Sequence, residues 1–144
     1  RFCDAAAKLK IVHHSTVLDV GGGNGDFGRV IEEIGLECNY INLDGCSTGI
    51  NLERILRLGK PDHISCLEVL EHLHNWERLL DLITDSYVKS AVCSVPNPAT
   101  VDVLGCDPTH VSIVPASAFT SRGWSVEPRS YYGKTSDTLL AFKY

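Results

Sequence analysis

A run of glycines follows a short apolar segment near the start of the chain, in the sequence STVLDVGGGNGDFG (residues 15–28), and Asp19 precedes the first of them by two positions. Glycines directly after a buried strand let the backbone come close to a ligand, because no Cβ stands in the way. The segment therefore predicts a ligand-binding turn with a carboxylate at its base.

A second segment, LEVLEHLHN (residues 67–75), gathers acidic and imidazole side chains at Glu68, Glu71, His72 and His74. Carboxylates and imidazoles close together can hold a divalent cation, and His110 in the later DPTHV segment could supply a further ligand. Imidazole also exchanges protons near neutral pH, so His72 or His110 could instead act as a general base. His74 is interpreted as a solvated residue of the following helix.

The hydrophobic pattern predicts the elements that must position these residues. Strands are expected at residues 16–20, 38–43, 63–70 and 90–95, helices at 26–34, 52–58, 74–87 and 115–124, a loop at 97–112, and a closing hairpin at 125–132 and 138–144. Strands that alternate with helices predict a mostly parallel sheet with helices on both faces, and the hairpin adds an antiparallel strand. Ligands of such sheets bind beyond the carboxyl ends of the strands, where the glycine turn, Asp44 and residues 67–75 all fall.

Two ligand classes fit the glycine turn. Gly23, Gly25 and Gly28 spell GxGxxG, the dinucleotide fingerprint, which would make the chain a nicotinamide-dependent oxidoreductase. Asp19, Gly21, Gly23 and Gly25 spell DxGxGxG, the loop that binds S-adenosylmethionine (SAM). Asp19 favours SAM, because a carboxylate at this point would repel a pyrophosphate but suits the α-ammonium group of SAM.

The segments VLDVGGGNGDFG, INLD and CLEVLEHLHNWERLL resemble the class I SAM-dependent methyltransferases, and most of all the group that includes the ubiquinone-biosynthesis O-methyltransferases. The resemblance covers about residues 15–143. It implies a Rossmann-like α/β fold with a sheet of seven strands, or six, whose last strand is antiparallel. It also implies SAM as the methyl donor, contacted by Asp19, Gly21, Gly23 and Gly25 at its methionine end, by Asp44 at its ribose, and by Glu68 beside it.

The chain departs from this family pattern between Asp44 and the third expected strand. About eighteen residues lie there, where the family fits a helix, a further strand and an acidic residue that contacts adenine. We interpret INLE (residues 50–53) as the remnant of that strand and Glu53 as the adenine contact.

The pattern Glu-x-x-Glu-His with a later His resembles two metal-dependent groups, the ubiquinone O-methyltransferases and the small-RNA 3′-terminal 2′-O-methyltransferases. This implies that Glu68, Glu71, His72 and His110 hold Mg²⁺ or Mn²⁺, which would lower the pKa of the acceptor hydroxyl. Many methyltransferases without a metal share EVLEHL, and there Glu68 lies beside SAM while Glu71 orients the next helix. The sequence leaves both interpretations open.

Composition bounds the class of protein. The 144 residues are 44% hydrophobic and 22% charged, as in one globular domain, and we expect residues 1–144 to be a single domain excised from or trimmed relative to a longer chain. No apolar run of about 18 residues predicts a membrane span. A net charge of −5 counts against non-specific nucleic-acid binding, and six cysteines without a CxxC pair predict a reducing, cytoplasmic compartment.

The sequence therefore predicts an enzyme that moves a methyl group from SAM to an oxygen, or else a nitrogen, of a small-molecule or RNA acceptor. A metal-dependent RNA 2′-O-methyltransferase is one alternative. A non-catalytic SAM-fold module of a larger protein is another, motivated by the short region between Asp44 and the third strand. No motif identifies the acceptor, the oligomeric state or the contribution of flanking domains.

Overall fold

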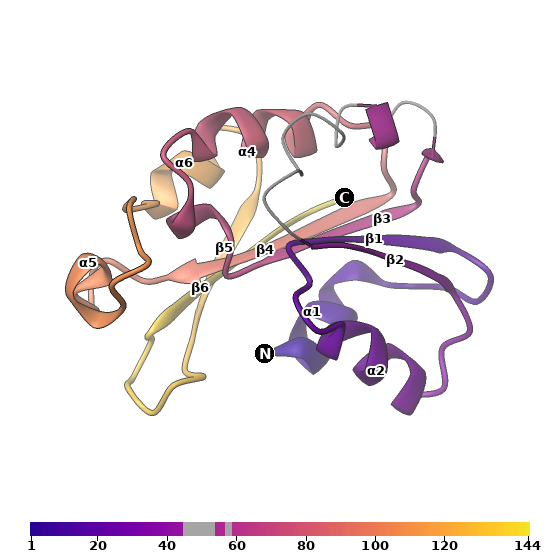
Figure 1. Cartoon of the computed structure of the whole chain (residues 1–144), viewed down its shortest axis with the longest axis horizontal. Coiled ribbons are helices and arrows are strands. Elements are labelled where there is room, and N and C mark those ends of the chain that lie inside the picture. The colour runs from indigo at the N-terminus through magenta and orange to yellow at the C-terminus, as the bar shows by residue number, and fades with distance from the viewer. Residues whose placement is uncertain (45–53, 57–58) are drawn as a thin grey trace.

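A six-stranded sheet forms the centre of the structure, a computed structural model that describes residues 1–44, 54–56 and 59–144 (Figure 1). The strands are β1 (Thr16–Val20), β2 (Asn39–Leu43), β3 (His63–Leu67), β4 (Ser90–Pro96), β5 (Ser125–Arg129) and β6 (Thr138–Lys143), in the order β2-β1-β3-β4-β6-β5. β1 to β4 pair in parallel, whereas β6 runs antiparallel to β4 and β5. The expected mostly parallel sheet with an antiparallel last strand is confirmed, with six strands in the described part of the chain.

Helices cover both faces of this sheet (Figure 1). α1 (Phe2–Leu9) and α2 (Asp26–Glu33) belong to a core cluster on one face that includes Phe27 and Phe142. α4 (Trp76–Thr84) and α6 (Ala116–Thr120) belong to a second cluster that includes Ile64 and Phe119. Every residue of β3 and β4 up to Pro96 is buried, as expected for parallel strands covered on both sides.

The third strand is shorter than expected. β3 ends at Leu67 because Glu68 has a left-handed backbone, with φ of 58°, which turns the chain out of the sheet. Residues Leu70–His72 then form a single 3-10 turn, η1, before α4 begins at Trp76. The sheet therefore stops at the first residue of the acidic segment and leaves the rest of it beyond the strand ends.

Two helices lie where the hydrophobic pattern predicts none. The expectation of a loop throughout residues 97–112 is wrong, because α5 (Val103–Cys106) forms there, with Asp102 accepting a hydrogen bond from the Gly105 N–H at its start. α1 occupies the segment before the first strand and buries Ala5, Ala6 and Leu9.

Part of the expected structure after β2 lies outside the described residues. The proposed strand remnant at 50–53, including Glu53, is there, and of the expected helix at 52–58 only residues 54–56 are described, which are helical. No helix in the described ranges is long and apolar enough to cross a membrane.

Candidate functional site

The glycine turn leaves β1 in a backbone shape that only glycine permits without strain. Gly21, Gly23 and Gly25 all have positive φ, at 72°, 52° and 76°. A Cβ on Gly22 would collide with the carboxylate of Asp19, so the loop also closes down on that side chain. A Cβ on Gly23, by contrast, would meet no atom of the described residues within 4 Å.

Asp19 supports this loop from below. The residue is 2% exposed, and its two oxygens accept hydrogen bonds from the Tyr40 hydroxyl on β2 and the Ser65 hydroxyl on β3, the latter at 2.7 Å. Burial raises the pKa of the Asp19 carboxyl, and the two hydrogen bonds partly offset that rise. Burial and the neighbouring carboxylate also raise the pKa of Tyr40. Asp19 therefore joins three strands at the base of the turn.

The end of β2 lies against the same turn. The Gly21 N–H donates to the Leu43 carbonyl at 2.7 Å, and Asn42 Nδ2 donates to the Gly23 carbonyl at 2.9 Å. Asp44, exposed, follows directly after this strand. The structure thus places Asp44 and the glycine turn at the carboxyl ends of two neighbouring strands, while Glu53 lies outside the described residues.

Glu68 stands at the end of β3 in the left-handed conformation described above. For a residue with a Cβ this backbone costs about 1 kcal/mol or more, and such positions cluster at functional sites. The Ser94 hydroxyl donates to Glu68 Oε1 at 2.7 Å, and the Glu68 N–H donates to the Ser94 carbonyl at 2.9 Å. Burial raises the pKa of the Glu68 carboxyl, and the Ser94 hydrogen bond opposes that rise.

Glu71, His72 and His110 form a cluster, with one ligand atom of each lying within 4.8 Å of the others. Glu71 has 0% of its surface exposed, yet neither of its carboxylate oxygens has a hydrogen-bond partner within the described part of the chain. Burial, followed by the charge of Glu68, raises the pKa of Glu71 to about 8. A buried carboxyl without partners is costly, so this side chain indicates a missing cation or donor.

The two imidazoles are held by backbone carbonyls. His72 Nδ1 lies 3.2 Å from the Thr109 carbonyl, and His110 Nδ1 lies 2.7 Å from the Val103 carbonyl. A carbonyl can only accept, so these two contacts are hydrogen bonds in the tautomer that carries the proton on Nδ1, and that tautomer leaves Nε2 available as a metal ligand. Metal-bound histidines typically have this arrangement, with the second ring nitrogen donating to a carbonyl.

The two residues that follow His110 are bonded to the carbonyl of Glu71, and this holds His110 beside η1. The Glu71 carbonyl accepts hydrogen bonds from the Val111 and Ser112 N–H groups, at 2.9 and 3.0 Å. The Ser112 hydroxyl adds a bond of 2.7 Å to the Leu73 carbonyl. As a result the rings of His72 and His110 meet edge to face, with 4.8 Å between their centroids.

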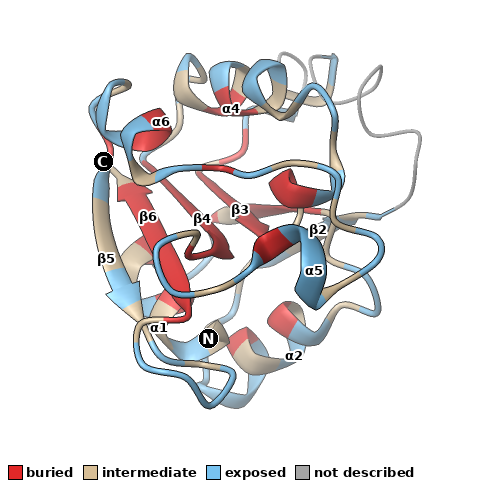
Figure 2. Cartoon of the chain, turned by 90° about the vertical axis from the view of Figure 1, so that its left-hand side faces the viewer, coloured by how far each residue is buried: buried red, intermediate tan, exposed pale blue. Residues whose placement is uncertain are grey.

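A cavity of about 390 Å³ opens onto this cluster. Glu68, Glu71, His72 and His110 line it, together with side chains from α5, the β5–β6 hairpin and the start of α1. Figure 2 looks onto this end of the sheet, where α5 stands in front of the strands. His74 is exposed and lies outside the cluster, as expected.

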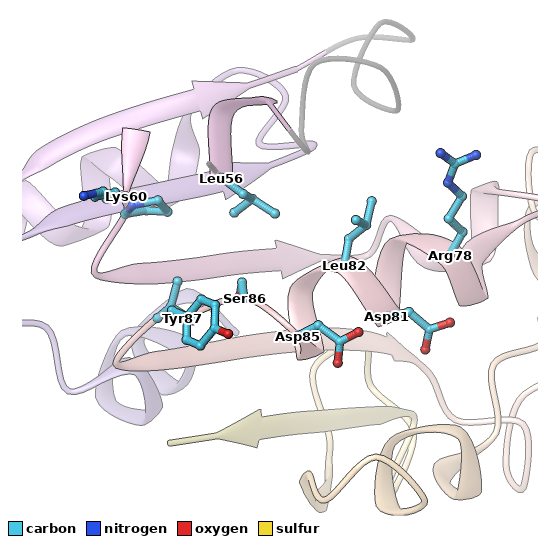
Figure 3. Close-up of a pocket in the computed structure, with 10 residues that line it drawn as sticks. Leu56, Lys60, Arg78, Asp81, Leu82, Asp85, Ser86 and Tyr87 are labelled. Atoms are coloured by element: carbon cyan, nitrogen blue, oxygen red, sulfur yellow. The ribbon is translucent and has the colours of Figure 1, made fainter. Parts of the chain in front are cut away.

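A second, larger cavity of about 720 Å³ lies at the opposite ends of the strands (Figure 3). It is lined by residues that precede β3 and β4, such as Lys60 and Tyr87, and by α4. Leu56 and Leu82 point into it. Among the described residues, no predicted site residue lines this cavity, and ligands of open α/β sheets bind at the carboxyl ends of the strands, so we place the candidate site at the smaller cavity.

Sequence reasoning missed several residues that build the site: Tyr40, Asn42, Ser65, Ser94 and Thr109. Ser65 and Ser94 did leave a signal, since each is a hydroxyl residue inside an otherwise apolar strand. The strand register supplies the missing information, because it sets Asp19 beside Asn42 on one side and Ser65 on the other.

Comparison with known proteins relates the chain to one family. The family described as "Methyltransferase domain" matches residues 2–124. A search of curated protein sequences found no match.

Among solved structures, a SAM-dependent methyltransferase from Archaeoglobus fulgidus is similar in fold, with a TM-score of 0.71 at 18% identity over 99% of this chain and 90% of that one. A complex between the Haloferax volcanii Trm112 methyltransferase activator and a methyltransferase gives a TM-score of 0.65 at 16% identity, and the match covers 97% of this chain and 86% of that one. The small RNA methyltransferase HEN1 gives a TM-score of 0.66 at 18% identity, and the match covers 97% of this chain but only 24% of HEN1. At these identities the likeness shows the fold.

Proposed function

Because the chain belongs to the methyltransferase domain family and has the fold of its SAM-dependent class, we propose that it transfers the methyl group of SAM to an oxygen of an acceptor that a divalent cation positions. The observation that carries the metal part is Glu71, a fully buried carboxyl beside two imidazoles, for which residues 1–44, 54–56 and 59–144 supply no hydrogen-bond partner.

The glycine turn is the proposed SAM site. A Cβ on Gly23 would meet no described atom within 4 Å, which supports a ligand over the loop, and Asp44 directly after β2 would accept hydrogen bonds from ribose hydroxyls. Asp19 has both oxygens engaged, so its proposed role is to shape the turn and lend negative charge to the ammonium group from below. Glu53 is kept as the proposed adenine contact on the sequence argument alone.

The proposed cation ligands are Glu71, His72 and His110, with Glu68 lining the same cavity. The residues fit a metal, because the protonated Nδ1 atoms leave Nε2 free and Glu71 has unused oxygens. Two imidazole donors favour Mn²⁺ over Mg²⁺, which prefers oxygen ligands. The metal, when bound, would act as a Lewis acid on the acceptor hydroxyl.

The chain itself positions the reacting groups. The carbonyls of Val103 and Thr109 orient the imidazoles, and the bond from Ser94 fixes the Glu68 carboxylate at the strand end between the glycine turn and the cavity. Methyl transfer from a sulfonium needs mainly in-line placement of the acceptor oxygen, so this preorganisation accounts for most of what the protein contributes.

Calorimetric titration of the metal-stripped domain with Mn²⁺ tests the proposal. His110→Ala and Glu71→Gln should each weaken Mn²⁺ binding by about 100-fold or more, because each removes a ligand. His74→Ala is the matched control, since His74 is exposed on the same segment and should leave Mn²⁺ binding unchanged. Equal Mn²⁺ affinity in all four proteins would refute the metal site and leave His72 or His110 as a general base.

The acceptor class is the second question. The resemblance of the Glu-x-x-Glu-His pattern to small-RNA methyltransferases, and the fold likeness to HEN1, support an RNA hydroxyl as one acceptor. The net charge of −5 favours a small molecule instead. Methyl transfer from labelled SAM to short RNA and to small hydroxyl compounds separates the two, and SAM binding without turnover on either would favour a non-catalytic module.

A further inference from the structure

The cavity at the amino ends of the strands lies beside a large exposed aromatic side chain. Tyr87, between α4 and β4, is fully exposed, and the lining of the cavity at which it stands includes Leu56, Leu82 and Val88 (Figure 3). Exposed apolar surface gathered around a hollow is typical of a protein–protein interface. Neither the proposed SAM site nor the proposed cation site uses this surface.

The outer face of α4, which lines the same cavity, carries opposite charges at its two ends. Leu80 and Ile83 are buried and hold the helix on the sheet. Arg78 in the first turn and Asp85 directly after the last turn are exposed. They are seven residues apart, so they lie on the same side of the helix, with Leu82 between them. This face therefore has a positive end, an apolar centre and a negative end.

Both charges have the unfavourable sign for their own helix. The helix dipole favours an anion at the N-terminus and a cation at the C-terminus, whereas Arg78 stands at the first and Asp85 at the second. Neither forms an ion pair with another of the described residues, while Asp81, between them, is paired with Arg122 at 2.6 Å. An antiparallel helix alongside α4 would offer each of them the favourable end of a dipole.

We propose that this face binds a second copy of the chain, with the two α4 helices packed antiparallel about a two-fold axis near Leu82. A two-fold interface is isologous, so Arg78 of each copy lies opposite Asp85 of the other and the contact forms twice. The symmetry also gives each charge the neighbouring dipole end that suits it, and it covers Tyr87 in both copies. The inference is independent of the proposed function, because the candidate site lies at the other ends of the strands.

Sedimentation equilibrium of charge-reversed variants tests the proposal. Arg78→Glu and Asp85→Arg should each weaken self-association by about 10-fold or more, because each reversal sets two pairs of like charges against each other. The double variant Arg78→Glu/Asp85→Arg restores opposite charges across the axis, so its dissociation constant should return close to that of the wild type. Tyr87→Ser should also weaken self-association, through the loss of buried aromatic surface.

Glu77→Lys is the matched control, because it reverses the charge of an exposed residue on the same helix, about 100° around the axis from Arg78. It should leave self-association unchanged. A wild-type chain that stays monomeric at every soluble concentration would overturn the proposal, and so would a dimer that both single reversals leave intact. A double variant that dissociates as readily as the single ones, while circular dichroism shows it folded, would overturn the antiparallel pairing.

Discussion

Glu71 makes the metal-free protein sensitive to pH in a way that the structure specifies. Its carboxyl has a pKa of about 8 in the folded protein, against 4.5 for an ordinary Glu, because burial and the charge of Glu68 disfavour ionisation. Below pH 4.5 both the folded and the unfolded chain carry the proton. As the pH rises from 4.5 to 8 the unfolded chain releases it first, so the folded state loses stability over this window.

The size of the effect follows from the shift. The free energy of unfolding should fall on the order of 3 kcal/mol between pH 4.5 and 7 on account of Glu71, and on the order of 5 kcal/mol by pH 9. Gln at position 71 cannot titrate, so the difference in unfolding free energy between Glu71→Gln and the wild type should change with pH by these same amounts. The buried amide adds a constant cost of about 1–3 kcal/mol that does not depend on pH.

Urea denaturation in the presence of a chelator, at intervals from pH 4.5 to 9, measures this difference. Glu77→Gln, an exposed residue in the first turn of α4, is the control and should track the wild type at every pH. Added Mn²⁺ should stabilise the wild type most at high pH and Glu71→Gln far less, because the cation needs the ionised carboxylate. A stability difference between Glu71→Gln and the wild type that stays constant with pH would refute this reasoning.

Three further predictions concern the elements around the site. Gly22→Ala should weaken S-adenosylhomocysteine binding, measured by calorimetry, by about 10-fold or more, because the added Cβ would collide with Asp19. Gly59→Ala is the control and should bind normally, because its Cβ would make only an ordinary van der Waals contact. Tyr40→Phe should lower the free energy of unfolding by about 1–3 kcal/mol in urea, since buried Asp19 loses a donor; unchanged stability would count against the support role of Asp19. Burial lowers the pKa of His63, so the wild type should lose stability relative to His63→Asn as the pH falls below 6.5. Thermal denaturation of both proteins above and below that pH measures this loss, and its absence would contradict the prediction.

Much of the fold follows from local sequence. The apolar strands, the helix after the glycine turn and the closing hairpin stand where their patterns predict them. α1 also carried a signal, since Phe2, Ala5, Ala6 and Leu9 recur at helical spacing and the last three are buried. The end of β3 carried no sequence signal, because apolar residues continue past Leu67 and only the backbone turn at Glu68 stops the strand.

The candidate site depends on contacts between distant parts of the chain, which spacing alone cannot supply. The bonds of Asp19 to Tyr40 and Ser65 follow from the register of three strands. The approach of His110 to His72 depends on a loop that is tied to the carbonyl of Glu71. The motifs indicate which residue types are available, and the sheet register and loop hydrogen bonds decide which of them meet.

The central claim is that SAM and a divalent cation bind side by side at the carboxyl ends of β1 and β3. The most direct measurement is the NMR signal of SAM labelled with ¹³C at its methyl group, bound to the domain and titrated with Mn²⁺. The signal should broaden strongly, because paramagnetic relaxation falls steeply with distance, and Glu71→Gln should abolish the broadening while SAM stays bound. A methyl signal that Mn²⁺ leaves sharp on the wild-type protein would contradict the account.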